Sequence, residues 1–192
     1  MLDINSLHLG DYSFTVKCTD PWIIVLHNFL TDSEIAYLLD VAKNRYQRSV
    51  VVGKDLSHEI NDKRTSSSCM FTKSENAVLS SIVQLVKYDT AEQYAPHFDY
   101  FDGATDYSKN EILLRGQRCL TILAYLSEPL SGGSTFFPRL NMHIEPKKGT
   151  AVLWFNTKKD GVQDPRTEHG GMPVHKGTKV AMNIWVRDKP YV

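Results

Sequence analysis

The chain has 192 residues, of which 42% are hydrophobic and 23% are charged, a composition typical of a globular domain. Its 22 basic and 22 acidic residues cancel, which argues against broad nucleic-acid binding and against attraction to a charged membrane surface. The length fits one domain over residues 1–192, and three widely separated cysteines are too few for a disulfide scaffold.

The amino-terminal segment shows no recognisable targeting signal. It lacks the basic region that opens a signal peptide, and the longest apolar run, Trp22–Leu26, is far too short to cross a bilayer. The sequence as it stands therefore predicts a soluble, cytoplasmic protein. The secretory pathway is the alternative if a targeting segment is missing.

The first predicted elements are a strand over Trp22–Leu26 and a helix soon after it. Thr31 and Glu34 form the T-x-x-E capping box that typically opens a helix. Apolar residues then recur at helical spacing, at Ile35, Leu38, Leu39 and Ala42. The spacing predicts a helix whose apolar stripe packs against a flat apolar surface.

Beyond Arg48 the pattern changes to short runs rich in β-branched and aromatic residues, separated by glycine and proline turns. Helices do not alternate with these runs, and Walker and GxGxxG nucleotide motifs are absent from the sequence. We predict a mainly β fold, an antiparallel sandwich or open barrel with supporting N-terminal helices. The supporting part is assigned to residues 1–81 and the strand-rich core to 82–190. The predicted strands are Ser49–Val52, Ile82–Tyr88, Cys119–Leu126, Ala151–Asn156 and Val180–Val186.

The sharpest local feature is a His-x-Asp motif formed by His97 and Asp99. On a strand, residues i and i+2 share a face, so these two side chains are predicted to project together. His169 can add a second imidazole, which completes the two-histidine, one-carboxylate triad of non-haem iron oxygenases. Lys179 follows ten residues later and offers a positive charge for a diacid whose other end chelates the metal.

Longer motifs around these residues resemble the prolyl 4-hydroxylase family of 2-oxoglutarate- and iron(II)-dependent dioxygenases, which are oxidoreductases. The resemblance implies a double-stranded β-helix, or jelly roll, with its metal at one open end. The likeness rests on several segments that occur in the family's order along the chain and are followed by Lys179 and Trp185. These segments are Arg64–Ser67, Gly116–Arg118, Thr121–Ser127, Gly132–Pro138, Lys147–Phe155 and His169–Val174.

The resemblance also implies roles for individual residues. His97, Asp99 and His169 are expected to ligate Fe(II). Lys179 is expected to bind the distal carboxylate of 2-oxoglutarate, with help from Tyr88 and Thr121. A further set is expected to line the groove for the substrate peptide: Tyr94, Arg118, Arg64, Ser66 and Trp185.

The implied reaction is 4-hydroxylation of prolyl residues in a peptide or protein, with decarboxylation of 2-oxoglutarate to succinate. O2 is the oxidant, and ascorbate is expected to restore oxidised iron. Two alternatives stay open: an oxygenase acting on a free amino acid or natural product, and a catalytically impaired jelly roll that binds proline-rich peptides. A structural zinc site fits poorly, because such sites are normally four-coordinate and closed.

Two features depart from the family pattern. Between Arg64 and Tyr88 the chain is shorter than its relatives, through a real deletion or an omitted stretch. A helix is expected to begin at 77–81, immediately before the strand that starts at Ile82. Arg187 stands where some relatives have histidine, so a different peptide preference is expected.

Overall fold

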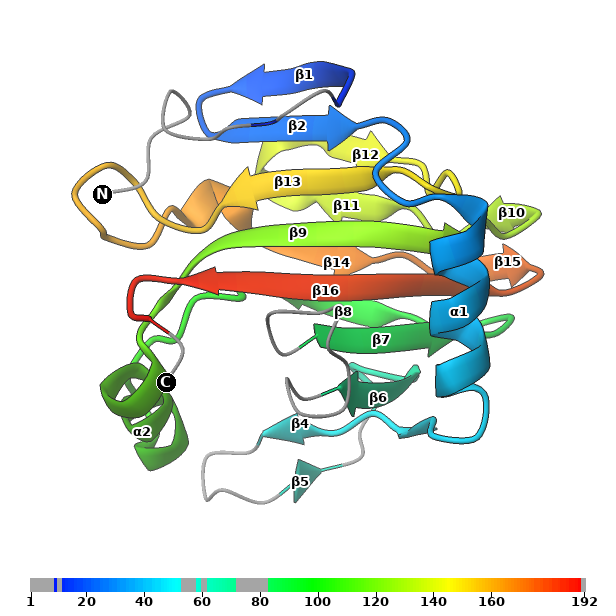
Figure 1. The fold of residues 1–192 in the computed structure, drawn as a ribbon. Coiled ribbons are helices and arrows are strands. Elements are labelled where there is room, and N and C mark those ends of the chain that lie inside the picture. The colour runs from blue at the N-terminus through cyan, green and yellow to red at the C-terminus, as the bar shows by residue number, and fades with distance from the viewer. Residues whose placement is uncertain (1–8, 10–11, 53–57, 60–61, 72–82, 191–192) are drawn as a thin grey trace.

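The computed structural model describes residue 9 and residues 12–52, 58–59, 62–71 and 83–190 (Figure 1). Two antiparallel sheets dominate these residues. The major sheet has the strand order β1-β2-β13-β9-β16-β7-β6-β3, and the minor sheet has the order β12-β11-β14-β8. Two short ribbons, β10-β15 and β4-β5, complete the strands. The prediction of a mainly β fold is confirmed.

The major sheet consists of β1 (Phe14–Thr19), β2 (Trp22–Leu26), β13 (Ala151–Phe155), β9 (Arg118–Ser127), β16 (Lys179–Arg187), β7 (Val83–Tyr88), β6 (Ser67–Phe71) and β3 (Gln47–Arg48). The minor sheet consists of β12 (Met142–Ile144), β11 (Thr135–Phe137), β14 (His169–Gly171) and β8 (Tyr94–His97). The ribbons are β10 (Ser131–Gly132) with β15 (Val174–Lys176), and β4 (Val51–Val52) with β5 (His58–Glu59). Two α-helices, α1 (Asp32–Ala42) and α2 (Asp106–Arg115), accompany short 3₁₀ turns at Pro138–Leu140 and Pro165–Thr167.

The long apolar runs lie in the central strands of the major sheet, where both faces of the sheet are buried. On β13, Leu153 joins the apolar cluster beneath α1, whereas Trp154 joins the cluster between the two sheets. This two-sided burial explains why the sequence shows continuous apolar runs where a half-exposed strand would alternate. The runs predicted for β9, β13 and β16 are confirmed to within one residue at each end.

The strand predicted over Trp22–Leu26 is confirmed as β2. The last two predicted strands, Ser49–Val52 and Ile82–Tyr88, are only partly matched. β4 covers the second half of the predicted Ser49–Val52, so Ser49 lies before the strand. β7 begins at Val83, and the predicted first residue, Ile82, lies outside the described residues. The helix expected at 77–81 also lies outside them.

Helix α1 crosses the outer face of the major sheet (Figure 1). Its predicted capping box is present: the Thr31 hydroxyl accepts from the backbone N–H of Glu34, and the Glu34 carboxylate accepts from the backbone N–H of Thr31 at 2.8 Å. Three members of the predicted stripe, Ile35, Leu38 and Ala42, are buried in the cluster beneath it. The apolar stripe therefore fixes α1 to the sheet.

Helix α2 differs from the sequence-based expectation, which placed all helical support near the N-terminus. It lies between β8 and β9, and α1 is the one α-helix among the described residues before Val83. Its sequence is mostly polar, only Ser108 is buried, and Leu113 and Leu114 are largely exposed, so no apolar stripe marks it. In the described part of the chain, neither helix is long and apolar enough to cross a membrane.

Candidate metal centre

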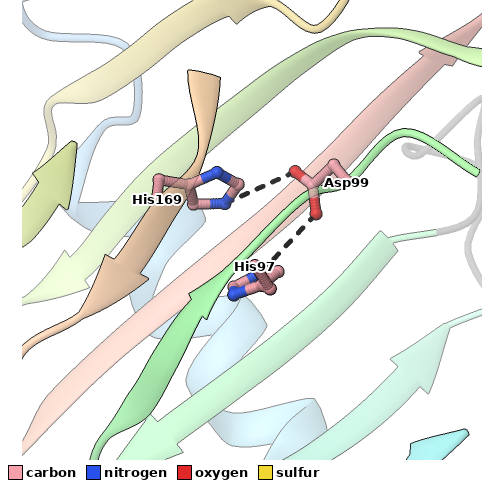
Figure 2. A group of neighbouring side chains, drawn as sticks. All are labelled: His97, Asp99 and His169. Carbon is pink, nitrogen blue, oxygen red and sulfur yellow. Dashed lines mark ion pairs between the residues drawn. The ribbon is translucent and has the colours of Figure 1, made fainter. Parts of the chain in front are cut away.

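Three side chains from the minor sheet and the loop after it converge at one point (Figure 2). His97 ends β8, His169 opens β14, and the two residues are cross-strand partners. Asp99 lies two residues beyond the end of β8. The expectation that His97 and Asp99 share one strand is therefore wrong, because only His97 belongs to it. The ladder ends at His97, and the following loop turns the carboxylate toward both imidazoles.

The distances suit a shared metal ion better than direct pairing. Nε2 of His97 is 3.8 Å from Oδ1 of Asp99, and Nε2 of His169 is 3.7 Å from Oδ2. Both separations are too long for hydrogen bonds. The three candidate ligand atoms all lie within 4.8 Å of one another, close enough to bind one ion together. Two imidazoles and one carboxylate form the donor set of an iron(II) facial triad.

Backbone carbonyls hold both imidazoles in the orientation that a ligand needs. Nδ1 of His97 is 2.9 Å from the carbonyl oxygen of Ala95, and Nδ1 of His169 is 3.0 Å from that of Thr167. A carbonyl can only accept, so each Nδ1 carries the proton and each Nε2 keeps its lone pair. Such a partner on the far nitrogen is typical of metal-ligating histidine.

The protonation states also favour metal binding. Burial, followed by the nearby His169, lowers the pKa of His97 to about 3, so its imidazole is neutral at physiological pH. Burial by itself raises the pKa of Asp99, but His169, His97, Arg118 and a hydrogen bond from Thr121 outweigh it and lower that pKa. Neutral imidazole and ionised carboxylate are the forms that bind a metal.

Lys179 lies in the same cavity and is almost completely buried, with 2% of its surface exposed. Its Nζ donates to the carbonyl oxygen of Gly133 at 2.7 Å and lies 5.3 Å and 5.5 Å from the ring centres of Tyr88 and Tyr125. Burial lowers its pKa to about 7, against a weaker opposing effect of Glu145. In the described part of the chain, no acidic side chain forms an ion pair with Lys179, which fits an anionic ligand bound beside it.

Of the two residues expected to assist Lys179, Tyr88 lies beside it, whereas Thr121 contacts Asp99. Tyr88 is the cross-strand partner of Lys179, and burial raises its pKa to about 12, so its hydroxyl keeps its proton. Thr121 is fully buried and donates its hydroxyl hydrogen to Oδ2 of Asp99 at 2.7 Å. The hydrogen bond that Thr121 donates therefore goes to the candidate metal ligand.

The predicted groove residues form two stacks of arginine on aromatic rings. On one side, the Tyr94 ring stacks on His97 at 3.7 Å between centres, and the guanidinium of Arg64 lies 4.5 Å from the Tyr94 ring centre. On the other side, the guanidinium of Arg118 lies 3.8 Å from the Trp185 ring centre. These four residues line the cavity, whereas Ser66, the fifth predicted groove residue, is buried and does not line it.

The cavity measures about 530 Å³ and brings most of the predicted site residues together. It is also lined by residues that the sequence analysis did not assign, among them Phe101 and Tyr107. Ser66 and Thr121 are the predicted site residues that do not line it; the Ser66 hydroxyl donates to that of Ser49 at 3.1 Å.

Two further polar contacts near the triad were missed. Asn156 donates from Nδ2 to the Thr121 hydroxyl at 2.9 Å, and Trp154 donates from Nε1 to Oδ1 of Asn156 at 2.9 Å. The only available signal was a polar asparagine at the end of an otherwise apolar predicted strand, on the same face as Trp154.

Comparisons with known proteins agree with this geometry. The family described as the 2OG-Fe(II) oxygenase superfamily matches residues 83–187. Prolyl 4-hydroxylase 1 of Arabidopsis thaliana is 32% identical over 220 residues, a match that covers 97% of this chain and 76% of that protein. The chain belongs to the prolyl 4-hydroxylase family. As a member of that family it is an oxygenase that uses Fe(II), 2-oxoglutarate and O2.

Solved prolyl hydroxylases share the fold. A viral collagen prolyl hydroxylase from Paramecium Bursaria Chlorella virus-1, solved with 2OG, has a TM-score of 0.68 at 24% identity and covers 89% of this chain and 98% of its own. A Trichoplax adhaerens prolyl hydroxylase, solved with a hypoxia inducible factor peptide, has a TM-score of 0.60 at 16% identity and covers 86% and 83%. The expected jelly roll is confirmed by these neighbours and by the two facing sheets.

Proposed function

We propose that this prolyl 4-hydroxylase family member hydroxylates proline residues at the 4-position in a peptide or protein, while 2-oxoglutarate is decarboxylated to succinate. The observation that carries the proposal is one cavity that contains both the His97, Asp99 and His169 cluster and the buried side chain of Lys179, which forms no ion pair with the described residues. When bound, iron supplies the redox chemistry with O2 and 2-oxoglutarate.

The residues around Lys179 prepare the site for a dianion. A buried ammonium group interacts strongly with a carboxylate because little water screens it. The Gly133 carbonyl holds the ammonium group in place, and the protonated Tyr88 hydroxyl can donate a hydrogen bond to the same ligand. Lys179 therefore binds the distal carboxylate in this proposal, and Tyr88 assists it.

A proline-rich peptide suits the rest of the cavity. Three of the cavity-lining side chains keep a donor without a partner among the described residues: Nε of Arg64, Nε of Arg118 and Nε1 of Trp185. A proline residue offers a carbonyl acceptor and no backbone N–H, so a lining rich in donors complements it. The aromatic surfaces of Tyr94 and Trp185 suit the preformed polyproline II helix.

The first test is spectroscopic. Anaerobic addition of Fe(II) and 2-oxoglutarate to the folded protein is expected to give a weak visible charge-transfer band. An absent band in well-folded protein contradicts the proposal at the level of the cofactors, and Lys179→Ala is expected to lose the band at 2-oxoglutarate concentrations that saturate the wild type.

The second test identifies the substrate class. Succinate release is expected to be stimulated by proline-rich peptides and not by free proline, with one oxygen atom added to the peptide by mass spectrometry. Stimulation by free proline alone supports the small-molecule alternative, and binding of the peptide without succinate release supports the impaired binding module. Ascorbate is proposed to extend the number of turnovers.

A further inference from the structure

We propose that Thr121, Asn156 and Trp154 form a positioning relay that fixes the carboxylate of Asp99 as a metal ligand. The relay, as we name this chain of three side chains, runs from the Trp154 indole N–H to Oδ1 of Asn156, from Nδ2 of Asn156 to the Thr121 hydroxyl, and from that hydroxyl to Oδ2 of Asp99. The three distances are 2.9, 2.9 and 2.7 Å. The inference rests on the proposed function in one respect, that the triad binds a metal.

The direction of every hydrogen bond in the relay is determined by chemistry. An indole N–H can only donate, so Asn156 must present its oxygen to Trp154 and its NH2 group to Thr121. The Thr121 hydroxyl accepts that bond and gives its single hydrogen to Asp99, since an ionised carboxylate can only accept. Thr121 then has no hydrogen left for the carboxylate of 2-oxoglutarate, so we assign it to the support of the metal ligand Asp99.

The relay is rigid because it is built on the centre of the major sheet. Trp154 of β13 and Thr121 of β9 are cross-strand partners. Both are completely buried, and Asn156 is 1% exposed. Buried hydrogen bonds of this kind are costly to break because no water replaces the lost partner.

Asp99 is the triad member that needs such support most. His97 and His169 are fixed by the β8–β14 ladder, whereas Asp99 lies in the loop beyond it. The relay therefore ties a loop carboxylate to the strands of the opposite sheet. Trp154 also packs edge-on against His169, with ring centres 4.6 Å apart, so the relay residues contact two of the three ligands.

The test compares Thr121→Val, which removes the hydroxyl at nearly constant shape, with Thr121→Ser, which keeps it. The measured quantities are the affinity for Fe(II) under anaerobic conditions, the Co(II) absorption spectrum, and the affinity of the metal-saturated protein for 2-oxoglutarate. Thr121→Val is expected to weaken Fe(II) binding about 10–100-fold and to change the Co(II) spectrum, as loss of an outer-shell partner does. Thr121→Ser is expected to restore both, and 2-oxoglutarate affinity is expected to stay at the wild-type value once metal is saturating.

Other outcomes separate the alternatives. Weaker 2-oxoglutarate binding with unchanged metal affinity overturns the relay and returns Thr121 to the role that the family resemblance implied. A lower melting temperature with unchanged metal affinity and spectrum means that the residue is merely structural. Failure of the wild type itself to bind Fe(II) and 2-oxoglutarate contradicts the proposed function instead.

Trp154→Phe gives a second measurement: it keeps an aromatic ring beside His169 and removes the indole N–H together with part of the buried ring volume. It is expected to weaken Fe(II) binding in the same direction as Thr121→Val but less, because the Asn156 amide loses the partner that sets its orientation. The combined Thr121→Val, Trp154→Phe variant is expected to bind Fe(II) no more weakly than Thr121→Val alone, since both act on one relay. Additive losses, or wild-type affinity in Trp154→Phe, contradict the relay beyond Thr121.

Discussion

Lys179 shows how a single residue can be unfavourable for the free protein and favourable for its complex. A buried lysine without a carboxylate partner loses hydration, and that loss lowers its pKa to about 7. The groups facing it are the neutral Tyr88 and Tyr125 rings, while Glu145 exerts a weak opposing charge. An incoming carboxylate favours the protonated lysine and raises its pKa again.

This proton linkage predicts a pH-dependent affinity for 2-oxoglutarate. Above the free-protein pKa, binding must take up a proton at Lys179, so affinity falls as pH rises. The dissociation constant of the metal-loaded protein is expected to increase about tenfold between pH 6 and pH 8. His97, with a pKa of about 3, stays neutral throughout this window. Calorimetry in buffers of different ionisation enthalpy measures both the affinity and the proton uptake.

Lys179→Arg is the matched control, because a guanidinium keeps its charge over the whole range. Its affinity for 2-oxoglutarate, whatever the absolute value, is expected to be independent of pH between 6 and 8. A wild-type affinity that is equally constant, with no proton uptake, contradicts the linkage.

Among the elements, α2 depends on the C-terminal end of β16 for its position. Arg187 donates to Glu111 at 2.8 Å and to the Gly116 carbonyl at 2.9 Å, and Lys189 donates to the carbonyls of Ile112 and Leu113 at 3.2 and 2.8 Å. Gly116 has φ +80°, a backbone conformation that favours glycine, and a Cβ at this position would lie 2.9 Å from Cβ of Lys189. The Arg187 side chain contacts a helix that lines the cavity through Tyr107 and Ser108, and the expected difference in peptide preference stays a prediction.

Arg187→Gln is therefore expected to loosen α2 and to weaken peptide binding without affecting 2-oxoglutarate. Both partners of the Arg187–Glu111 pair are only 13% exposed, so the loss is expected to cost about 1–3 kcal/mol of local stability. Hydrogen exchange of the amides in 106–115 is expected to accelerate, and KM for the peptide to rise. The affinity for 2-oxoglutarate reports whether the rest of the cavity stays intact.

The control is the second ion pair of Glu111. A guanidinium nitrogen of Arg115 lies 3.1 Å from a carboxylate oxygen of Glu111, and the Arg115 side chain is 45% exposed. Arg115→Gln removes a pair of the same chemistry in which the arginine is exposed, and is expected to change stability by less than about 1 kcal/mol. Equal exchange rates in the two variants contradict the assignment of Arg187 as the residue that holds α2.

The contrast between elements explains what the sequence could predict. The strands at the centre of the sheet were predictable because burial on both faces leaves uninterrupted apolar runs, and α1 because its cap and stripe are local. Helix α2 was not predictable in this way, since contacts from Arg187 and Lys189, remote in sequence, fix it. The same holds for the link from Asn156 to Thr121, which depends on strand register.

At the scale of the whole molecule, the site spans the two sheets. His97 and His169 belong to the minor sheet, while Lys179 opens β16 of the major sheet and Thr121 of β9 holds Asp99. The apolar cluster between the two sheets holds them together in the free protein. Bound metal and 2-oxoglutarate are therefore expected to add a second connection between the sheets. A ligand that binds only the folded protein stabilises it by mass action.

Thermal unfolding under anaerobic conditions measures this connection. At 100-fold excess over the dissociation constant, each ligand is expected to stabilise the fold by about 2.7 kcal/mol. For a chain of this length the melting temperature should rise by roughly 5–10 °C per ligand. His169→Ala is expected to lose both increases, because 2-oxoglutarate chelates the metal, whereas Lys179→Ala should keep the increase due to Fe(II) and lose the one due to 2-oxoglutarate. An Fe(II)-dependent increase of wild-type size in His169→Ala places the metal elsewhere in the protein.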